Sequence, residues 1–142
     1  MRFMVIVKAS AASEAGELPS SELLVQMGAF NEAMVKAGVL LAAVGLQPSS
    51  AGVRLRFGDS GDVAVIDGPF AETKELIAGY WLIDVASRDE AIAWMRRAPF
   101  ERTEIDIRRV FEAADFAPAM TPEQIASEEQ LRVELLAQGR PV

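Results

Sequence analysis

One short stretch of the chain concentrates ionisable side chains around a Gly-Pro step. It runs from Asp67 to Glu75 with the sequence DGPFAETKE. Proline fixes its own φ and has no N–H, while glycine accepts unusual backbone angles, so this step breaks regular structure and predicts a tight loop. Functional groups often lie on loops held by a rigid scaffold. We therefore take this loop as the candidate site.

Asp67 is the candidate catalytic residue of this loop. It follows a predicted strand, Val63 to Ile66. We expect its carboxylate in a partly buried cleft, where burial raises a carboxylate pKa toward acid/base work, or where it could bind a cationic ligand. A structural alternative stays open, in which the side chain accepts hydrogen bonds from the backbone of the Gly68-Pro69 turn.

Further side chains on and after the loop are predicted to bind a ligand together with Asp67. They are Phe70, Glu72, Lys74, Glu75, Tyr80 and Trp81. In the functional interpretation Lys74 attracts an anionic ligand, while Glu72 or Glu75 binds it or transfers a proton. In the alternative these are solvated charges joined by a weak ion pair. The three aromatic rings could line a ligand cavity, or else pack in the core or in a dimer interface.

The chain contains neither histidine nor cysteine, which restricts its chemistry. Disulfides, thiolate nucleophiles, Ser-His-Asp triads and Cys/His zinc sites are excluded. Proton transfer would need a carboxylate or lysine of shifted pKa, or Tyr80. A metal site would have to be built from oxygen ligands alone. We expect no metal and no cofactor.

The net charge and the hydropathy of the chain limit which partners and which cellular location are expected. The 142 residues include 14 Lys and Arg against 21 Asp and Glu, so the formal net charge is -7. Phosphate backbones repel such a surface, and we expect no direct binding to nucleic acid. No run approaches the roughly 20 apolar residues of a membrane span, and the apolar start is too short for a signal peptide. We expect a cytoplasmic protein with no membrane contact.

The hydrophobic periodicity predicts strands and helices in the order β-α-β-β-β-β-α-β. The expected ranges are 2–8, 20–37, 39–46, 53–57, 63–66, 76–85, 87–98 and 104–111, with a polar loop over 10–19. Apolar side chains alternate with two arginines over 53–57, which predicts a strand with one buried and one polar face. This order indicates an α+β, ferredoxin-like subunit with both helices on one face of the sheet.

The first strand is apolar on both faces, which bears on assembly. Phe3, Val5 and Val7 alternate with Met4 and Ile6. If the helices cover one face, the other face needs a cover of its own, and a second subunit is the simplest one. We therefore expect a homodimer.

The C-terminal part has a different character. Residues 112–120 are predicted to be a linker, and Thr121-Pro122 begins a helix over about 122–138. A Thr cap, a Pro at the first helical position and a Gln three residues after the Thr are typical of a helix start. We expect a core domain over 1–116 and a helical extension over 117–142.

The loop and its surroundings resemble a known family. The run DGPFAETKE, the following Gly79-Tyr80-Trp81 and the earlier Met27-Gly28-Ala29-Phe30-Asn31-Glu32 are similar to the YCII-related (DGPF-domain) family over residues 1 to about 116. The resemblance implies dimeric α+β barrels, made of ferredoxin-like subunits paired through their sheets. Related YCII-like proteins carry a His-Asp pair in a cleft, which this chain lacks because it has no His. Many DGPF-type proteins are encoded near extracytoplasmic-function sigma factors, which implies a link to regulation.

Two functions follow as hypotheses. The first is a homodimer that binds an unknown small molecule in a cleft at the loop from Asp67 to Glu75, with carboxylate-assisted acid/base chemistry if it is an enzyme. The second is a non-catalytic interaction module that acts with a sigma factor, for which the negative charge would suit a basic partner surface.

Overall fold

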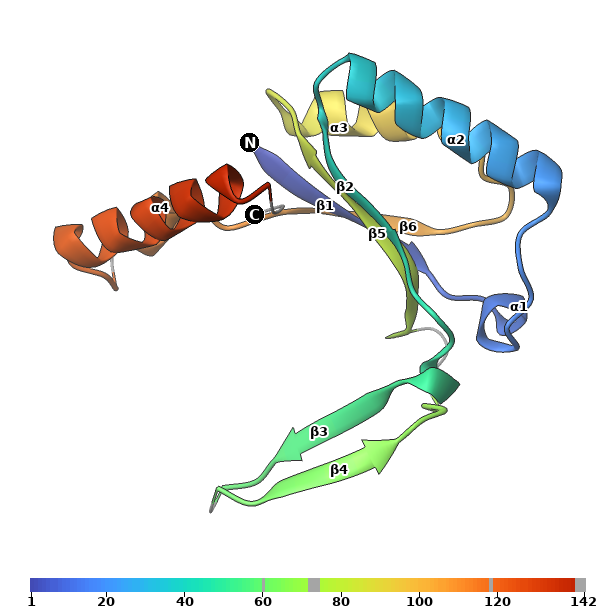
Figure 1. Ribbon diagram of the computed structural model, residues 1–142, viewed down its shortest axis with the longest axis horizontal. Coiled ribbons are helices and arrows are strands. Elements are labelled where there is room, and N and C mark those ends of the chain that lie inside the picture. Colours follow the sequence, from blue (N-terminus) through green and yellow to red (C-terminus); the bar gives the residue numbers. More distant parts are fainter. Residues whose placement is uncertain (60, 72–74, 118, 140–142) are drawn as a thin grey trace.

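A computed structural model describes residues 1–59, 61–71, 75–117 and 119–139 of the chain. Figure 1 shows the arrangement of the helices and strands. In chain order the elements are β1 (Arg2–Lys8), α1 (Ala11–Glu14), α2 (Ser21–Lys36), β2 (Leu40–Gly45), the 3₁₀ turn η1 (Ser49–Ala51), β3 (Val53–Phe57), β4 (Val63–Asp67), β5 (Ile77–Asp84), α3 (Arg88–Met95), β6 (Ile105–Arg109), the 3₁₀ turn η3 (Ala113–Phe116) and α4 (Pro122–Ala137).

The main sheet has four antiparallel strands in the order β2-β5-β1-β6. Helices α2 and α3 lie together on one side of it (Figure 1). This is the ferredoxin-like plan, and the predicted fold class and element order are confirmed. The sequence analysis did not predict α1 or the 3₁₀ turn η3. The first lies within the expected polar loop and the second within the expected linker.

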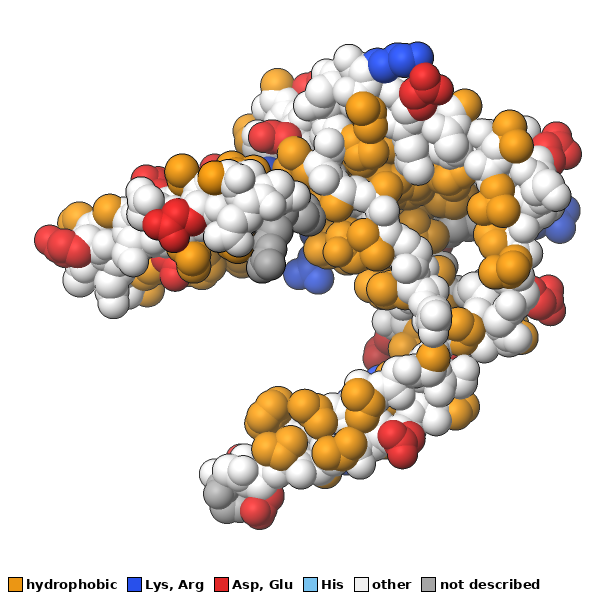
Figure 2. Space-filling view, viewed as in Figure 1, with side chains coloured by type: hydrophobic (Ala, Val, Ile, Leu, Met, Phe, Trp, Pro, Cys, Tyr) orange, Lys and Arg blue, Asp and Glu red, His pale blue; other side chains and the backbone are white. Residues whose placement is uncertain are grey.

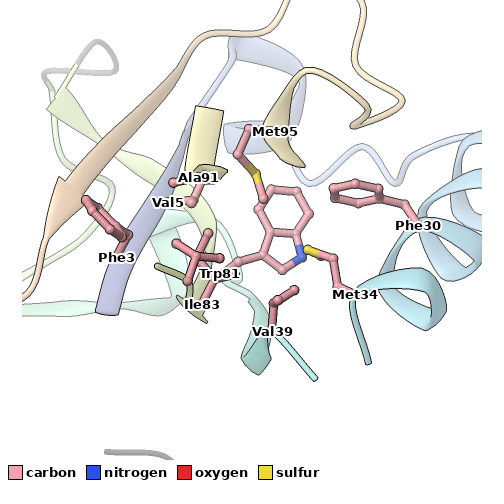
Figure 3. Packing of buried hydrophobic residues seen from close by; sticks show 10 residues of the cluster. Phe3, Val5, Phe30, Met34, Val39, Trp81, Ile83, Ala91 and Met95 are labelled. Carbon is pink, nitrogen blue, oxygen red and sulfur yellow. The ribbon is translucent and has the colours of Figure 1, made fainter. Parts of the chain in front are cut away.

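The core lies between the sheet and these two helices. Val5 of β1 pairs with Trp81 of β5, and both side chains face the helices. Figure 3 shows Met34, Phe30 and Met95 around the indole ring of Trp81. The rings of Phe30 and Trp81 meet edge to face, 5.9 Å apart, and the indole N–H donates to Asn31 over 2.8 Å. Phe30 and Met34 lie four residues apart on α2 and are both buried, so this face of the helix packs in the core.

Hydrogen bonds of side chains cap the ends of the helices, including the start at Thr121 that the sequence predicts. Ser87 accepts a hydrogen bond from the N–H of Glu90 at the start of α3. Thr121 accepts one from Gln124, whose side chain accepts one from the N–H of Thr121, at the start of α4. Gly38, just past the end of α2, has a φ of +71°, in the left-handed region that glycine occupies most easily.

The hairpin of β3 and β4 forms a separate two-stranded sheet. Figure 1 shows it extending away from the main sheet. The expectation that 53–57 has one buried face is therefore wrong. The whole of β3 is exposed, because none of the elements that the structure describes packs over the hairpin's apolar face (Figure 2). Alternation along the strand showed which side is apolar but could not show whether anything covers it.

The second face of the main sheet also carries apolar side chains. Antiparallel partners point to the same face, so Met4 with Leu82 and Ile6 with Tyr80 face away from α2 and α3.

At the C-terminal end of the described chain, α4 packs against η3 and buries none of its residues completely. Within the described ranges, none of the helices has the length and hydrophobicity needed to cross a bilayer.

Candidate functional site

The loop that follows β4 is held tightly against η1. Asp67 ends β4, and the peptide bond from Gly68 to Pro69 is cis. The N–H of Gly68 donates to the carbonyl of Gly52 over 3.0 Å. A Cβ atom at position 68 would lie 1.7 Å from the carbonyl oxygen of Ser49. Only glycine allows the two backbone segments to approach this closely.

Ser49 connects three parts of the chain at this point. Its Oγ accepts a hydrogen bond from the N–H of Phe70 over 3.0 Å and donates one to the carboxylate of Glu14. Its own N–H donates to both carboxylate oxygens of Glu14, each over 3.2 Å. Glu14 lies at the end of α1, so α1, η1 and the loop after β4 are joined through one serine. The sequence analysis missed Ser49 and Glu14, because they are 35 residues apart and only folding brings them together.

A cavity of about 350 Å³ opens beside this junction. Glu14, Ser49 and Phe70 line it, together with apolar residues that include Leu46 and Ile77. The guanidinium of Arg54 lies over the ring of Phe70 on β3's side, 4.1 Å from the ring centre. The cavity therefore offers an aromatic ring, a half-buried carboxylate and a hydroxyl within an apolar surround. Such a set suits binding of a small molecule that has an apolar body and a polar group.

Asp67 does not lie in this cavity. Its side chain is exposed at the end of β4, and within the described residues it makes no hydrogen bond or ion pair. Among the described residues its carboxylate accepts no hydrogen bond from the Gly68-Pro69 turn, so the structural alternative is not seen there, and Ser49 holds the turn instead. Its role as acid/base or ligand-binding residue stays a prediction. Glu72 and Lys74 lie outside the described residues.

Glu75 lies at the end of the loop, and its charge acts on a lysine on the sheet face that points away from α2 and α3. Lys8 of β1 donates to Asp106 of β6 over 2.7 Å. The hydrogen bond to Asp106 is the main cause that raises the pKa of Lys8; desolvation opposes it, and the negative charges of Asp106, Glu104 and Glu75 raise the pKa further. Lys8 is therefore a cation throughout the neutral range and is no candidate base. Sequence reasoning missed this group, because the two residues lie on different strands.

Tyr80 and Trp81 border another cavity, of about 270 Å³, between α2 and the strands β2 and β5, although the side chain of Tyr80 points to the other face of the sheet. Trp81 is 5% exposed and belongs to the core, which agrees with the packing alternative for this residue. Gly79, just before them, faces the carbonyl of Val44 on β2, and a Cβ there would lie 2.5 Å from that oxygen. The structure thus separates these rings from Phe70, which lines the cavity at the loop.

The described residues contain no group of three or more Asp and Glu side chains placed to hold a metal ion together.

Comparison with known proteins adds two findings. The family model of the YCII-related domain matches residues 1–114. An uncharacterized protein of Rhizobium meliloti (strain 1021) is 44% identical over 70 residues, which cover 49% of this chain and 56% of that protein. The chain thus spans little more than half the length of this curated relative.

Proposed function

This chain belongs to the YCII-related domain family, and we propose that it is a homodimeric small-molecule-binding protein whose ligand lies at the loop after β4. The observation that carries the proposal is the cavity beside the junction of Glu14, Ser49 and Phe70. Its volume of about 350 Å³ falls at the lower end of the range of small-molecule sites.

The junction gives the cavity a preorganised wall. Three segments that are distant in sequence are joined there by hydrogen bonds of Ser49, and Gly68 is wedged against the same residue. Binding groups held in place by such contacts lose less conformational entropy when a ligand arrives. This favours a binding role for the loop over a role as a simple connection.

The lining indicates the class of ligand. A flat apolar part would lie against Phe70, and a donor group such as an amine or amide N–H would face the carboxylate of Glu14. The exposed carboxylate of Asp67 lies three residues before Phe70 in the same loop, and its negative charge would add to the attraction of a cationic group. If the site also catalyses a reaction, Asp67 is the proposed acid/base.

The homodimer is proposed from the uncovered apolar surfaces. The exposed fractions of Leu55, Phe57 and Val65 on the hairpin are 51%, 74% and 67%. Figure 2 shows apolar side chains gathered along the hairpin of β3 and β4. Apolar surface of this extent is rare on a monomer, and a second copy, paired through the open sheet face and the hairpin, would cover both.

The same surfaces favour the second candidate, an interaction module that acts with a sigma factor. In that case the hairpin's apolar face would bind a different protein, and the cavity at Phe70 would stay empty.

A thermal-shift screen of small cationic and amide-bearing metabolites tests the first candidate. We expect a ligand to raise the stability by about 2.7 kcal/mol at 100 times its Kd. We expect Phe70→Ala to abolish this shift and Asp67→Asn to reduce it. Asp59→Asn makes the same change of charge at the far end of the hairpin and should leave it intact. Absence of any hit, or a hit that Phe70→Ala leaves unchanged, would count against the site.

A further inference from the structure

Arg2 is buried without a partner for its side chain. It is 7% exposed and is the one buried charged residue among those the structure describes. Its Nε has no hydrogen-bond partner. An arginine stays protonated in a protein, so it cannot avoid the cost of burial by losing its charge. Buried charges are normally paired, because an unpaired one is strongly destabilising.

Two carboxylates on neighbouring elements are already engaged. Asp84 pairs with Arg2 across the strands β1 and β5, but its side chain accepts from the amino group of Met1 over 2.9 Å. Asp115 of η3 accepts two hydrogen bonds from Arg109, each over 3.1 Å. The backbone of Arg2 is also fixed, because its carbonyl accepts from the N–H of Val110 over 2.9 Å. The sheet thus fixes the backbone of Arg2, while its guanidinium has no ion pair among the described residues.

Arg2 lines a cavity of about 470 Å³ between the start of β1, η3 and α4. Arg132 of α4 lines the same cavity, and its Nε is likewise buried without a hydrogen-bond partner. Much of the remaining lining is apolar: Phe111, Phe116, Met120, Leu131 and Leu135.

Three glutamates also border the cavity, namely Glu112, Glu128 and Glu129. Among the described residues, neither arginine forms an ion pair with any of them within 4.0 Å. Glu128 and Glu129 are exposed and therefore keep their hydration. They do not replace the missing partner of Arg2.

We propose that this cavity binds a small carboxylate with an apolar body. The carboxylate would accept hydrogen bonds from the terminal N–H groups of Arg2, since the Nε itself is buried away from the cavity, and the guanidinium fork suits such bidentate binding. Arg132 would add a second positive charge, and the aromatic and aliphatic side chains would cover the body of the ligand. This site shares no lining residue with the cavity at Phe70.

Isothermal titration with hexanoate, octanoate and decanoate tests the proposal, with octanamide as the neutral probe of the same shape. We expect octanoate to bind and octanamide to bind at least about tenfold more weakly, since hydrogen bonds to a charged group contribute about 1.5–3 kcal/mol. Arg2→Met should weaken octanoate binding by about tenfold to a hundredfold. Arg132 lies on α4 and not in the sheet, so Arg132→Met should weaken octanoate binding without disturbing the packing of the core. Arg108→Met, an exposed arginine of β6, is the matched control and should change nothing.

A second measurement does not depend on the choice of ligand. If Arg2 is unpaired in the free protein, Arg2→Met removes a buried charge and should raise the melting temperature. A lower melting temperature in Arg2→Met would show that a group of the protein already pairs with Arg2. That result, equal binding of octanoate and octanamide, or no binding of any of the three carboxylates would overturn the proposal.

Discussion

The hydroxyl oxygen of Ser49 accepts a hydrogen bond from the backbone N–H of Phe70 over 3.0 Å, across 21 positions of sequence. The same hydroxyl donates to Glu14. The loop with the most recognisable sequence in this chain is therefore shaped by a serine outside it. Because Phe70 lines the cavity at that loop, the position of the cavity wall depends on Ser49.

Ser49→Ala tests this dependence. The change removes the acceptor for Phe70 and one donor to the half-buried carboxylate of Glu14. We expect a loss of about 1–3 kcal/mol of unfolding free energy, the usual cost of leaving such groups unsatisfied. Urea denaturation measures it. Ser50→Ala, at an exposed position in the same turn, should change the unfolding free energy by less than about 0.5 kcal/mol. Equal effects of the two variants would contradict the role of Ser49.

Gly68→Ala tests the contact between the loop and η1. The added Cβ would meet the carbonyl of Ser49 at 1.7 Å, so backbone must move. We expect a destabilisation of about 1–3 kcal/mol or more, as for other overpacked sites. Gly28→Ala is the control, since this glycine lies in α2 and its added Cβ would meet nothing within 4 Å beyond its chain neighbours and the backbone of its own helix. Alanine is the better helix former, so this control should stabilise the protein by up to about 1 kcal/mol. Thermal unfolding compares the two.

The Lys8–Asp106 pair predicts a dependence of stability on alkaline pH. The pKa of Lys8 is raised above 10.5, chiefly by its hydrogen bond to Asp106. A raised folded-state pKa means that the stabilisation is complete below the unfolded value and is lost as the pH rises through the folded one. We expect wild type to lose more stability than Lys8→Met between about pH 9 and pH 12. Asp106→Asn should resemble Lys8→Met. Parallel pH profiles for all three proteins would exclude this linkage.

Leu55→Glu tests the proposed homodimer. Leu55 is 51% exposed on the apolar face of the hairpin, so a charge there should leave the subunit folded while opposing association. We expect wild type to sediment as a dimer and Leu55→Glu to sediment as a monomer at the same concentration. Ala64→Glu adds the same charge to the opposite face of the hairpin, where Ala64 pairs with Arg56, and should remain a dimer. A monomeric wild type would refute the assembly.

The order of strands and helices was predictable from the sequence because it depends on local patterns. The apolar positions of α2 recur at helical spacing, and Phe30 and Met34 are buried as this pattern requires. The helix starts at Ser87 and Thr121 follow from capping within a few residues. Helix α1 was missed, since four residues are too few for a hydrophobic period to appear.

Only the tertiary structure decided which strand faces are buried and which partners the charged and polar groups bind. Alternation from Val53 to Phe57 identified an apolar face, but the hairpin leaves the main sheet and that face stays exposed. The partners of Phe70 and Lys8, and the burial of Arg2, depend on segments brought together by folding. A local pattern records the period of a helix or strand, whereas hydrogen bonds, ion pairs and desolvation depend on distances in space between residues far apart in the chain.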